Sequence, residues 1–301
     1  MSGNLLIDKT DRQHYTELVY SGCLQSNTKK ETTGNSMRQI GKLLGILVIL
    51  SLGLVVLAAC AQPTATPPTT TTPSVTTPPP PSPATIALGG KLYDNWMKTA
   101  GVATPEGNSP LWAGQTTNTR TGKDTWRCKE CHGWDYKGKD GAYSKGSHLT
   151  GFPGVYGAAR TKTSAELTAV LKGSANSNHN FSTYLNADQI SALAAFLKEG
   201  AVIDESQYID YATKKPKSAD IAKGKTLYDV TCAACHGADG KLILFDGKDS
   251  LGFLANDNPY EVIHKIRFGQ PGAGMPSAIE QQKSIQDVID ILGYAQTLPT
   301  K

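Results

Sequence analysis

Two short segments of this 301-residue chain combine residues that can bind a metal or carry out redox chemistry. Residues 128–132 read CKECH, and residues 232–236 read CAACH. Each segment is a CxxCH motif, in which a histidine directly follows the second cysteine. Such a motif is compatible with a redox-active cysteine pair, with half of a zinc site, or with covalent attachment of haem. The neighbouring sequence has to distinguish these three chemistries.

Covalent haem attachment is the chemistry that uses every residue of both motifs. A thioredoxin-like pair is typical of a βαβ setting, and neither motif follows a strand-like run. A zinc ribbon needs a second CxxC about 15–20 residues away, whereas these motifs lie about a hundred residues apart. In haem attachment the two thiols form thioethers with the vinyl groups, and the histidine becomes the proximal iron ligand. We therefore expect two covalently bound haem c groups, with four cysteines and two proximal histidines: Cys128, Cys131, Cys232, Cys235, His132 and His236.

The two motifs belong to a repeat, which indicates that one structural unit occurs twice. GKLYD at residues 90–94 precedes the first motif, and GKTLYD at 224–229 precedes the second, which aligns Gly90 with Gly224. Each copy then continues through a glycine-rich loop into an amphipathic stretch, at 164–172 and at 259–268.

The last helix of each copy has its own start signal. Asn186 and Ser284 are N-cap residues: Gln189 reaches back to the first cap, and Asp287 lies in the first turn after the second. Apolar residues then recur on one side at helical spacing. We expect an all-α chain with two tandem helical domains, each wrapped round one haem, at 86–200 and 217–301, joined by a linker at 201–216.

The residues before these domains have the layout of an export signal. Arg38 and Lys42 precede an apolar run at 43–57, and small residues lead into Cys60. The ending LAAC resembles a bacterial lipobox, in which the cysteine is lipidated and becomes the first mature residue. An uncleaved membrane helix is the alternative, since the run is nearly long enough to span a bilayer. We expect a signal peptide at 37–59 and an exported protein, anchored through Cys60 to the outer face of the cytoplasmic membrane or to the cell envelope.

Apart from Cys60, two further N-terminal segments are expected to carry no chemistry. Residues 1–36 are polar, lack periodicity and lie upstream of a complete signal, so they resemble a misassigned start, and we give Cys23 and His14 no role. Residues 60–85 are rich in proline and threonine, which favours a disordered, extended stalk.

With both motifs and both helices in view, each copy resembles a class I c-type cytochrome domain. The resemblance covers about residues 86–301 and rests on the N-terminal glycine–tyrosine helix, the CxxCH motif and the terminal helix. It implies a small helical bundle around an edge-exposed haem. It also implies one-electron transfer between redox partner proteins, and a sixth iron ligand from the loop before the last helix.

The resemblance points to a different sixth ligand in each copy. In the second copy the sequence GMP around Met275 matches the usual distal motif of the family, which implies Met275 as ligand. The first copy has no methionine between its CxxCH motif and residue 200. Six residues separate Gly269 from Met275, and six separate Gly173 from His179, so we expect His179 to take the place of the methionine. His148 is the alternative ligand, and otherwise we expect it to contact backbone or a haem propionate.

Three further features complete the comparison of the copies. The family often has a proline whose carbonyl accepts the N–H of the proximal histidine, and Pro153 occupies that place in the first copy. The second copy has residues 251–254 at this place, so the carbonyl that would accept from His236 is not identified.

His264 falls within a helix and is expected to pack or to face water. Residues 99–125 form an insert without a counterpart in the second copy, for which a cover over the first haem is one possible role.

Electron relay and catalysis are the two functions that these features allow. Catalysis at haem iron needs an open or labile sixth position, whereas both haems are expected to have a strong ligand, and we find no catalytic triad or carboxylate pair. We therefore expect an electron-transfer protein with a bis-histidine first haem and a His/Met second haem. A dihaem oxidoreductase of the peroxidase or thiosulfate-oxidising kind is the alternative, and a purely structural module comes third. The small net charge of +4 gives no sign of nucleic-acid binding.

Overall fold

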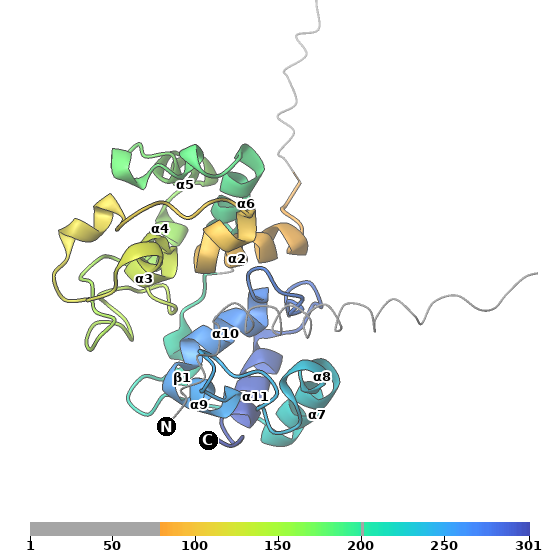
Figure 1. The fold of residues 1–301 in the computed structure, drawn as a ribbon. Helices are drawn as coiled ribbons and strands as arrows, with labels where there is room; N and C mark the ends of the chain where they lie inside the picture. The colour runs from red at the N-terminus through yellow and green to blue at the C-terminus, as the bar shows by residue number, and fades with distance from the viewer. Residues whose placement is uncertain (1–78, 200–201) are drawn as a thin grey trace, which may run out of the picture. The chain divides into compact units, whose positions relative to one another are not determined.

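The structure is a computed structural model that describes residues 79–199 and 202–301 (Figure 1). The predicted signal peptide, Cys60 and most of the proline-rich segment lie outside these residues. We refer to residues 79–199 as the first half and to residues 202–301 as the second half. None of the helices in these two described ranges is long and apolar enough to cross a membrane.

The first half consists of helices and short 3-10 turns (Figure 1). Its first helix begins at the N-cap Ser82, and Asn186 forms the predicted capping box of its last helix. The first helix therefore begins slightly before the expected domain boundary at residue 86. In chain order the elements are α2 (Pro83–Ala100), η1 (Pro110–Gly114), η2 (Gly122–Trp126), α3 (Cys128–His132), α4 (Tyr156–Thr161), α5 (Ser164–Leu171), η3 (Ser177–His179), η4 (Phe181–Thr183) and α6 (Ala187–Lys198).

The second half is also mainly helical, which agrees with the expected helical fold. Two short strands pair antiparallel, with Ile209 opposite Pro216, in the segment that we expected to be a plain linker. They are the only strands in the described residues, and the expectation of an all-α chain omitted them. The elements are η5 (Glu205–Gln207), β1 (Ile209–Asp210), β2 (Lys215–Pro216), α7 (Ile221–Thr231), α8 (Ala233–His236), α9 (Leu251–Asp257), α10 (Pro259–Phe268) and α11 (Ile285–Ala295).

In each half the first helix crosses the last helix at a glycine. A Cβ atom on Gly89 of α2 would overlap the backbone of Ala192 in α6, and one on Gly224 of α7 would overlap the backbone of Asp290 in α11. The structural counterpart of Gly224 is therefore Gly89, and the alignment of Gly90 with Gly224 is wrong by one residue. The two adjacent glycines of the first copy looked equivalent in the sequence, and only the helix crossing distinguishes them.

A tyrosine of the first helix holds the CxxCH turn in each half. The Tyr93 hydroxyl donates a hydrogen bond to the carbonyl of Gly133 over 2.6 Å, and the Tyr228 hydroxyl donates to the carbonyl of Gly237 over 2.7 Å. Both glycines directly follow the histidine of the motif and have left-handed φ angles of 77° and 81°, which glycine adopts without steric cost. The two halves thus place their CxxCH motifs against the first helix through the same contact.

Each of the two apolar clusters contains side chains from both halves. Phe268 of α10 belongs to the cluster built mainly by the first half, while Trp134 and Tyr143 belong to the cluster built mainly by the second half. A Cβ atom on Gly90 would overlap the ring of Phe268, so the bare glycine is what admits this ring. The two halves therefore pack against each other through buried apolar side chains.

The close contact at Gly90 gives a testable prediction. Gly90→Ala should lower the free energy of unfolding by about 1–3 kcal/mol, because the new methyl group overpacks the Phe268 ring. Gly157→Ala is the matched control, since its Cβ would meet open space in α4, and it should raise stability by about 0.5–1 kcal/mol. Urea unfolding of both variants measures the difference, and equal effects would contradict the predicted contact.

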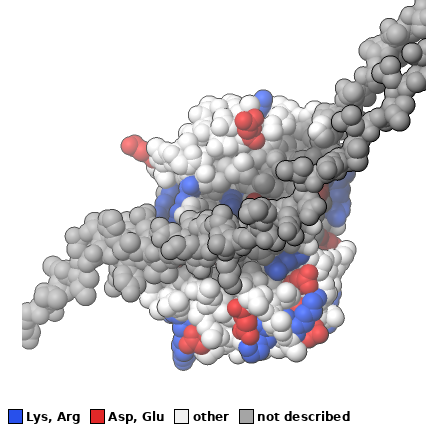
Figure 2. All heavy atoms as spheres, turned by 90° about the vertical axis from the view of Figure 1, so that its right-hand side faces the viewer, with Lys and Arg blue, Asp and Glu red and all other residues white. Residues whose placement is uncertain are grey.

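Charged residues are mixed on the face that Figure 2 shows. Acidic and basic side chains alternate there instead of gathering into a patch of one sign. Over the whole sequence, residues 86–200 contain 13 Lys and Arg against 9 Asp and Glu, and residues 217–301 contain 9 against 10. Long-range attraction of an acidic partner would therefore be weak and would act mainly through the first half.

Candidate haem sites

A pocket in the second half brings together the predicted haem ligands of that half. Its walls enclose about 590 Å³, including space that is open to solvent. The CxxCH motif lies on this pocket, and so does Met275, although a long stretch of chain separates them. The lining residues are Thr231, Cys232, Cys235, His236, Ile266, Gly274, Met275, Pro276, Ala278, Gln281, Lys283 and Ile291.

The loop that carries Met275 is folded back onto the end of α10. The amide of Ala278 donates a hydrogen bond to the carbonyl of Ile266 over 2.9 Å. Gly269, which follows α10, has a φ angle of 86°, and a Cβ atom there would come within 2.6 Å of the Met275 carbonyl. These contacts hold the methionine at the pocket through backbone geometry.

The predicted proximal histidine of the second half, His236, is a half-buried ring that favours its neutral form. Burial lowers the pKa of His236 below its ordinary value. Its Nδ1 atom is buried and has no hydrogen-bond partner among the described residues. The second half therefore shows no carbonyl that accepts from His236 in the way that the Pro153 carbonyl accepts from His132. The ring stacks on Phe245 at a centroid distance of 6.3 Å. A neutral imidazole is the form that binds a metal ion.

In the first half, the structure places His179 beside His132, the predicted proximal histidine. His132 ends α3 and His179 ends η3, and their ring centroids are 6.3 Å apart with the planes at 74°. Two imidazoles that bind one metal from opposite sides, each at about 2 Å, have centroids about 6 Å apart. The separation therefore fits one metal ion between the two rings.

Backbone carbonyls orient both of these rings. The Nδ1–H of His132 donates to the carbonyl of Pro153 over 2.7 Å, which confirms the predicted role of that carbonyl. The Nδ1–H of His179 donates to the carbonyl of Val170 over 3.2 Å. Burial, and to a smaller extent the nearby His179, lowers the pKa of His132 to about 4. Both rings therefore keep an unprotonated Nε2 atom, the arrangement expected of histidines that bind a metal.

His148, the alternative ligand, lies in different surroundings. Its Nε2 atom is 3.5 Å from Nη2 of Arg120, and its ring lies 5.3 Å from that of Tyr143. Burial and the positive charge of Arg120 lower the pKa of His148. Its closest described partner is thus a guanidinium, whereas the described ring that lies beside His132 is that of His179.

Three of the four cysteines of the motifs have a raised thiol pKa, which disfavours a redox role for these three. Cys128, Cys131 and Cys232 are free thiols, and burial raises the pKa of each to about 12. Thiol redox chemistry depends on a lowered pKa that produces the thiolate at neutral pH. Protonated thiols beside a neutral histidine are instead consistent with residues placed for covalent attachment of a cofactor.

The insert of the first half lies against the turn that carries His179. Helix η1, which belongs to the insert, contacts η3. The indole N–H of Trp96 donates to the carbonyl of Trp126 over 2.8 Å, and the indole N–H of Trp126 donates to the carbonyl of Gly107 over 3.1 Å. Residues 99–125 have no counterpart in the second copy, and the contact of η1 with η3 places part of them beside the turn that carries His179.

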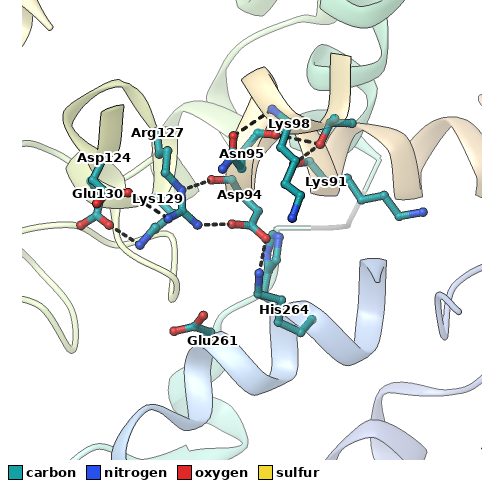
Figure 3. Close-up of polar contacts among 12 residues, drawn as sticks. Lys91, Asp94, Asn95, Lys98, Asp124, Arg127, Lys129, Glu130, Glu261 and His264 are labelled. Atoms are coloured by element: carbon teal, nitrogen blue, oxygen red, sulfur yellow. Dashed lines mark hydrogen bonds and ion pairs between the residues drawn. The ribbon is translucent and has the colours of Figure 1, made fainter. Parts of the chain in front are cut away.

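Two residues outside the predicted sites also prove to be important. His264 is fully buried between the halves, so it packs and does not face water. Asp94 is likewise fully buried, and its carboxylate pairs with Arg127 at 2.6 Å and with Lys265 (Figure 3). The sequence placed His264 and Asp94 in helices but did not indicate their burial, because their partners come from distant segments.

Comparison with known proteins supports haem chemistry in this chain, with a family match over the second CxxCH motif. Residues 219–294 match the family described as cytochrome c oxidase, cbb3-type, subunit III. A protein of Mycobacterium leprae (strain TN), named "Cytochrome bc1 complex cytochrome c subunit", is 26% identical over 189 residues, which are 60% of this chain and 61% of that protein. The chain thus spans about three fifths of the length of this relative. No solved structure matches. These similarities support a c-type cytochrome that transfers electrons by means of covalently bound haem.

Proposed function

We propose that this c-type cytochrome carries two haem groups and relays single electrons between redox partner proteins at a membrane. The observation that supports two haems is that each half combines a CxxCH motif with a candidate sixth ligand at the same site. When bound, haem supplies the reversible one-electron change of its iron. The residues of the chain hold the group, orient its ligands and limit the access of water.

In the first site we assign His132 as the proximal ligand and His179 as the distal ligand. Their ring separation of 6.3 Å and the carbonyls that orient both rings support this assignment over His148, which lies beside Arg120. Cys128 and Cys131 would form the thioethers. The insert that contacts η3 would then stabilise the distal side of this site.

In the second site we assign His236 and Met275 as the axial ligands. Both line the same largely apolar pocket, together with Cys232 and Cys235, which would form the thioethers. Each half would therefore be a cytochrome c-like domain. The shared tyrosine-to-glycine hydrogen bond and the shared glycine crossing of first and last helix support this tandem arrangement.

Electron relay is better supported than catalysis at one of the haems. A dihaem oxidoreductase needs an iron position that substrate can reach. In both sites a histidine ring or a methionine lies where it can serve as the sixth ligand. We therefore propose a carrier, and a low-spin absorption spectrum of the resting protein is the expected result.

We also propose that a lipid on Cys60 tethers the protein to the outer face of the membrane. The basis is the sequence layout of residues 37–60, which lie outside the described structure. The relative from Mycobacterium leprae is named as a subunit of a cytochrome bc1 complex. A cytochrome bc1 complex is accordingly the kind of redox partner that we propose.

Counting the covalent haems tests this function directly. The double variants Cys128→Ala/Cys131→Ala and Cys232→Ala/Cys235→Ala should each retain one of two haems, whereas His148→Ala should retain both. Intact mass and resistance to acid–acetone extraction give the count. Two haems that survive in either double variant, or haem that is extracted from the parent protein, would contradict the assignment.

A further inference from the structure

A buried aromatic seam joins the two halves, and we propose that it conducts electrons between the two haem sites. We define the aromatic seam as Trp134 and Tyr136 of the first half together with His264 of the second half. This inference rests on the proposed presence of two haems. It adds a specific route through residues that neither CxxCH motif contains.

His264 is the centre of the seam. Its Nε2 atom lies 2.9 Å from the carbonyl oxygen of Gly90, which can only accept, so Nε2 carries the proton. The hydroxyl of Tyr136 then donates to Nδ1 over 2.8 Å. The Trp134 ring lies 5.0 Å from the imidazole, centroid to centroid. Both nitrogens of the ring are therefore used in contacts with the first half.

On the first-half side, the seam continues into the proximal turn of the first site. Trp134 follows His132 by two residues, so a short covalent path connects the ligand to the seam. The Tyr136 backbone belongs to the same turn, because its amide donates to the carbonyl of Gly133 over 3.3 Å. The amide of Gly138 donates in turn to the carbonyl of His132 over 2.9 Å.

In the second half, His264 lies in the same helix as a residue that lines the pocket of that half. Ile266, two residues after His264 in α10, lines that pocket. The same helix ends at Phe268 and continues into the loop that carries Met275. Helix α10 therefore contacts the first half through His264 and forms part of the second site through Ile266.

The backbone of Tyr136 gives an independent reason to connect the seam with function. Tyr136 is fully buried and has a φ angle of 64°, in the left-handed region that bulky residues avoid. Such strain persists only where the surroundings determine the conformation, and it is common at functional sites. Here the strained conformation accompanies a hydroxyl hydrogen-bonded to His264 of the other half.

The proposed step transfers one electron and no proton. With haem bound at both sites, the first site would lose one electron and the second would gain it, so that one site would be oxidised and the other reduced by one unit. Bonded and closely packed atoms provide stronger electronic coupling than a gap of the same length. His264 and Tyr136 keep their protons, because the hydrogen bonds of His264 already suit its neutral form.

The test compares two phenylalanine variants of the full-length protein with bound haem. Tyr136→Phe removes the hydroxyl that joins the seam to His264. Tyr143→Phe removes a hydroxyl that also joins the halves, since Tyr143 donates to Asn258 over 2.6 Å, but it lies outside the seam. Pulse radiolysis adds one electron per molecule, and the different absorption bands of the two haems report how fast it redistributes. We expect several-fold slower redistribution in Tyr136→Phe and an unchanged rate in Tyr143→Phe.

Two measurements separate this inference from the proposed function. Haem content and both reduction potentials should match those of the parent protein in both variants, which isolates the route from the sites. The ¹⁵N spectrum of His264 should show a protonated Nε2 in the parent and in Tyr143→Phe, and an altered Nδ1 signal in Tyr136→Phe. Equal rates in the parent and Tyr136→Phe, or equal slowing in both variants, would overturn the route. A count of one haem would refute the proposed function, while the ¹⁵N result would still test the geometry of the seam.

Discussion

Replacing Asp94 by asparagine is expected to lower the free energy of unfolding by about 3–5 kcal/mol, the range measured when one partner of a buried ion pair is removed. Asp94 is fully buried and pairs with Arg127 of the first half and Lys265 of the second half. Without the carboxylate, these two cations would remain close together with little access to water. The loss should therefore destabilise both the first half and its contact with α10.

The repeat supplies a matched control for this variant. Asp229 follows Tyr228 as Asp94 follows Tyr93, but among the described residues it pairs only with Lys225 at the surface, over 2.6 Å. Because solvent screens an exposed pair, Asp229→Asn should leave the stability unchanged within the error of measurement. Urea unfolding of the two variants gives the comparison. A similar loss of unfolding free energy in both variants would show that the contribution of Asp94 to stability does not depend on its burial.

The same carboxylate predicts how stability depends on pH. Burial by itself would raise the pKa of Asp94, but Lys265 and Arg127 lower it by more, so the pKa lies below its ordinary value of 3.8. A group with a lowered pKa in the folded state stabilises the fold above the unfolded-state pKa, and this contribution is lost as the pH falls through the folded-state pKa. The stability difference between the parent and Asp94→Asn should therefore be constant at neutral pH and shrink below pH 3.8.

The second large effect that we expect is a difference in reduction potential between the two haems. The site with His236 and Met275 should have the higher potential, because a thioether ligand favours ferrous iron more than a second imidazole does. A redox titration should show two steps separated by on the order of 0.1 V, a modest part of the roughly 0.8 V that axial ligands span. Electrons would then move from the first site to the second.

Three histidine variants test the assignment behind this difference. His179→Met should raise the lower potential and narrow the gap, because it gives the first site the same kind of ligand as the second. His148→Ala should leave both potentials and the low-spin spectrum unchanged, since His148 lies beside Arg120 and not beside His132. Electron paramagnetic resonance spectra report which side chains are the axial ligands of the first haem iron. A bis-histidine signal that persists in His179→Ala would refute His179 as ligand.

The sequence by itself determined those features whose chemistry lies within a few consecutive residues. The CxxCH motifs place two thiols and an imidazole next to each other whatever the rest of the chain does. The caps at Asn186 and Ser284 were predictable for the same reason, since each depends on residues three positions apart, and the structure has both capping boxes. The helical character of both halves followed from local periodicity, which the two short strands of the second half lack.

Only the tertiary structure decided which of several similar residues enters a given environment. Asp94 and Asp229 occupy the same place in the repeat, yet one is buried and the other exposed, because only the first faces α10. His179 and His148 both follow the first motif, but the loop after α5 brings His179 to His132. The burial of His264 likewise depends on carbonyl and hydroxyl groups from the other half. Burial and charge pairing arise from contacts between distant segments, which a local sequence pattern does not record.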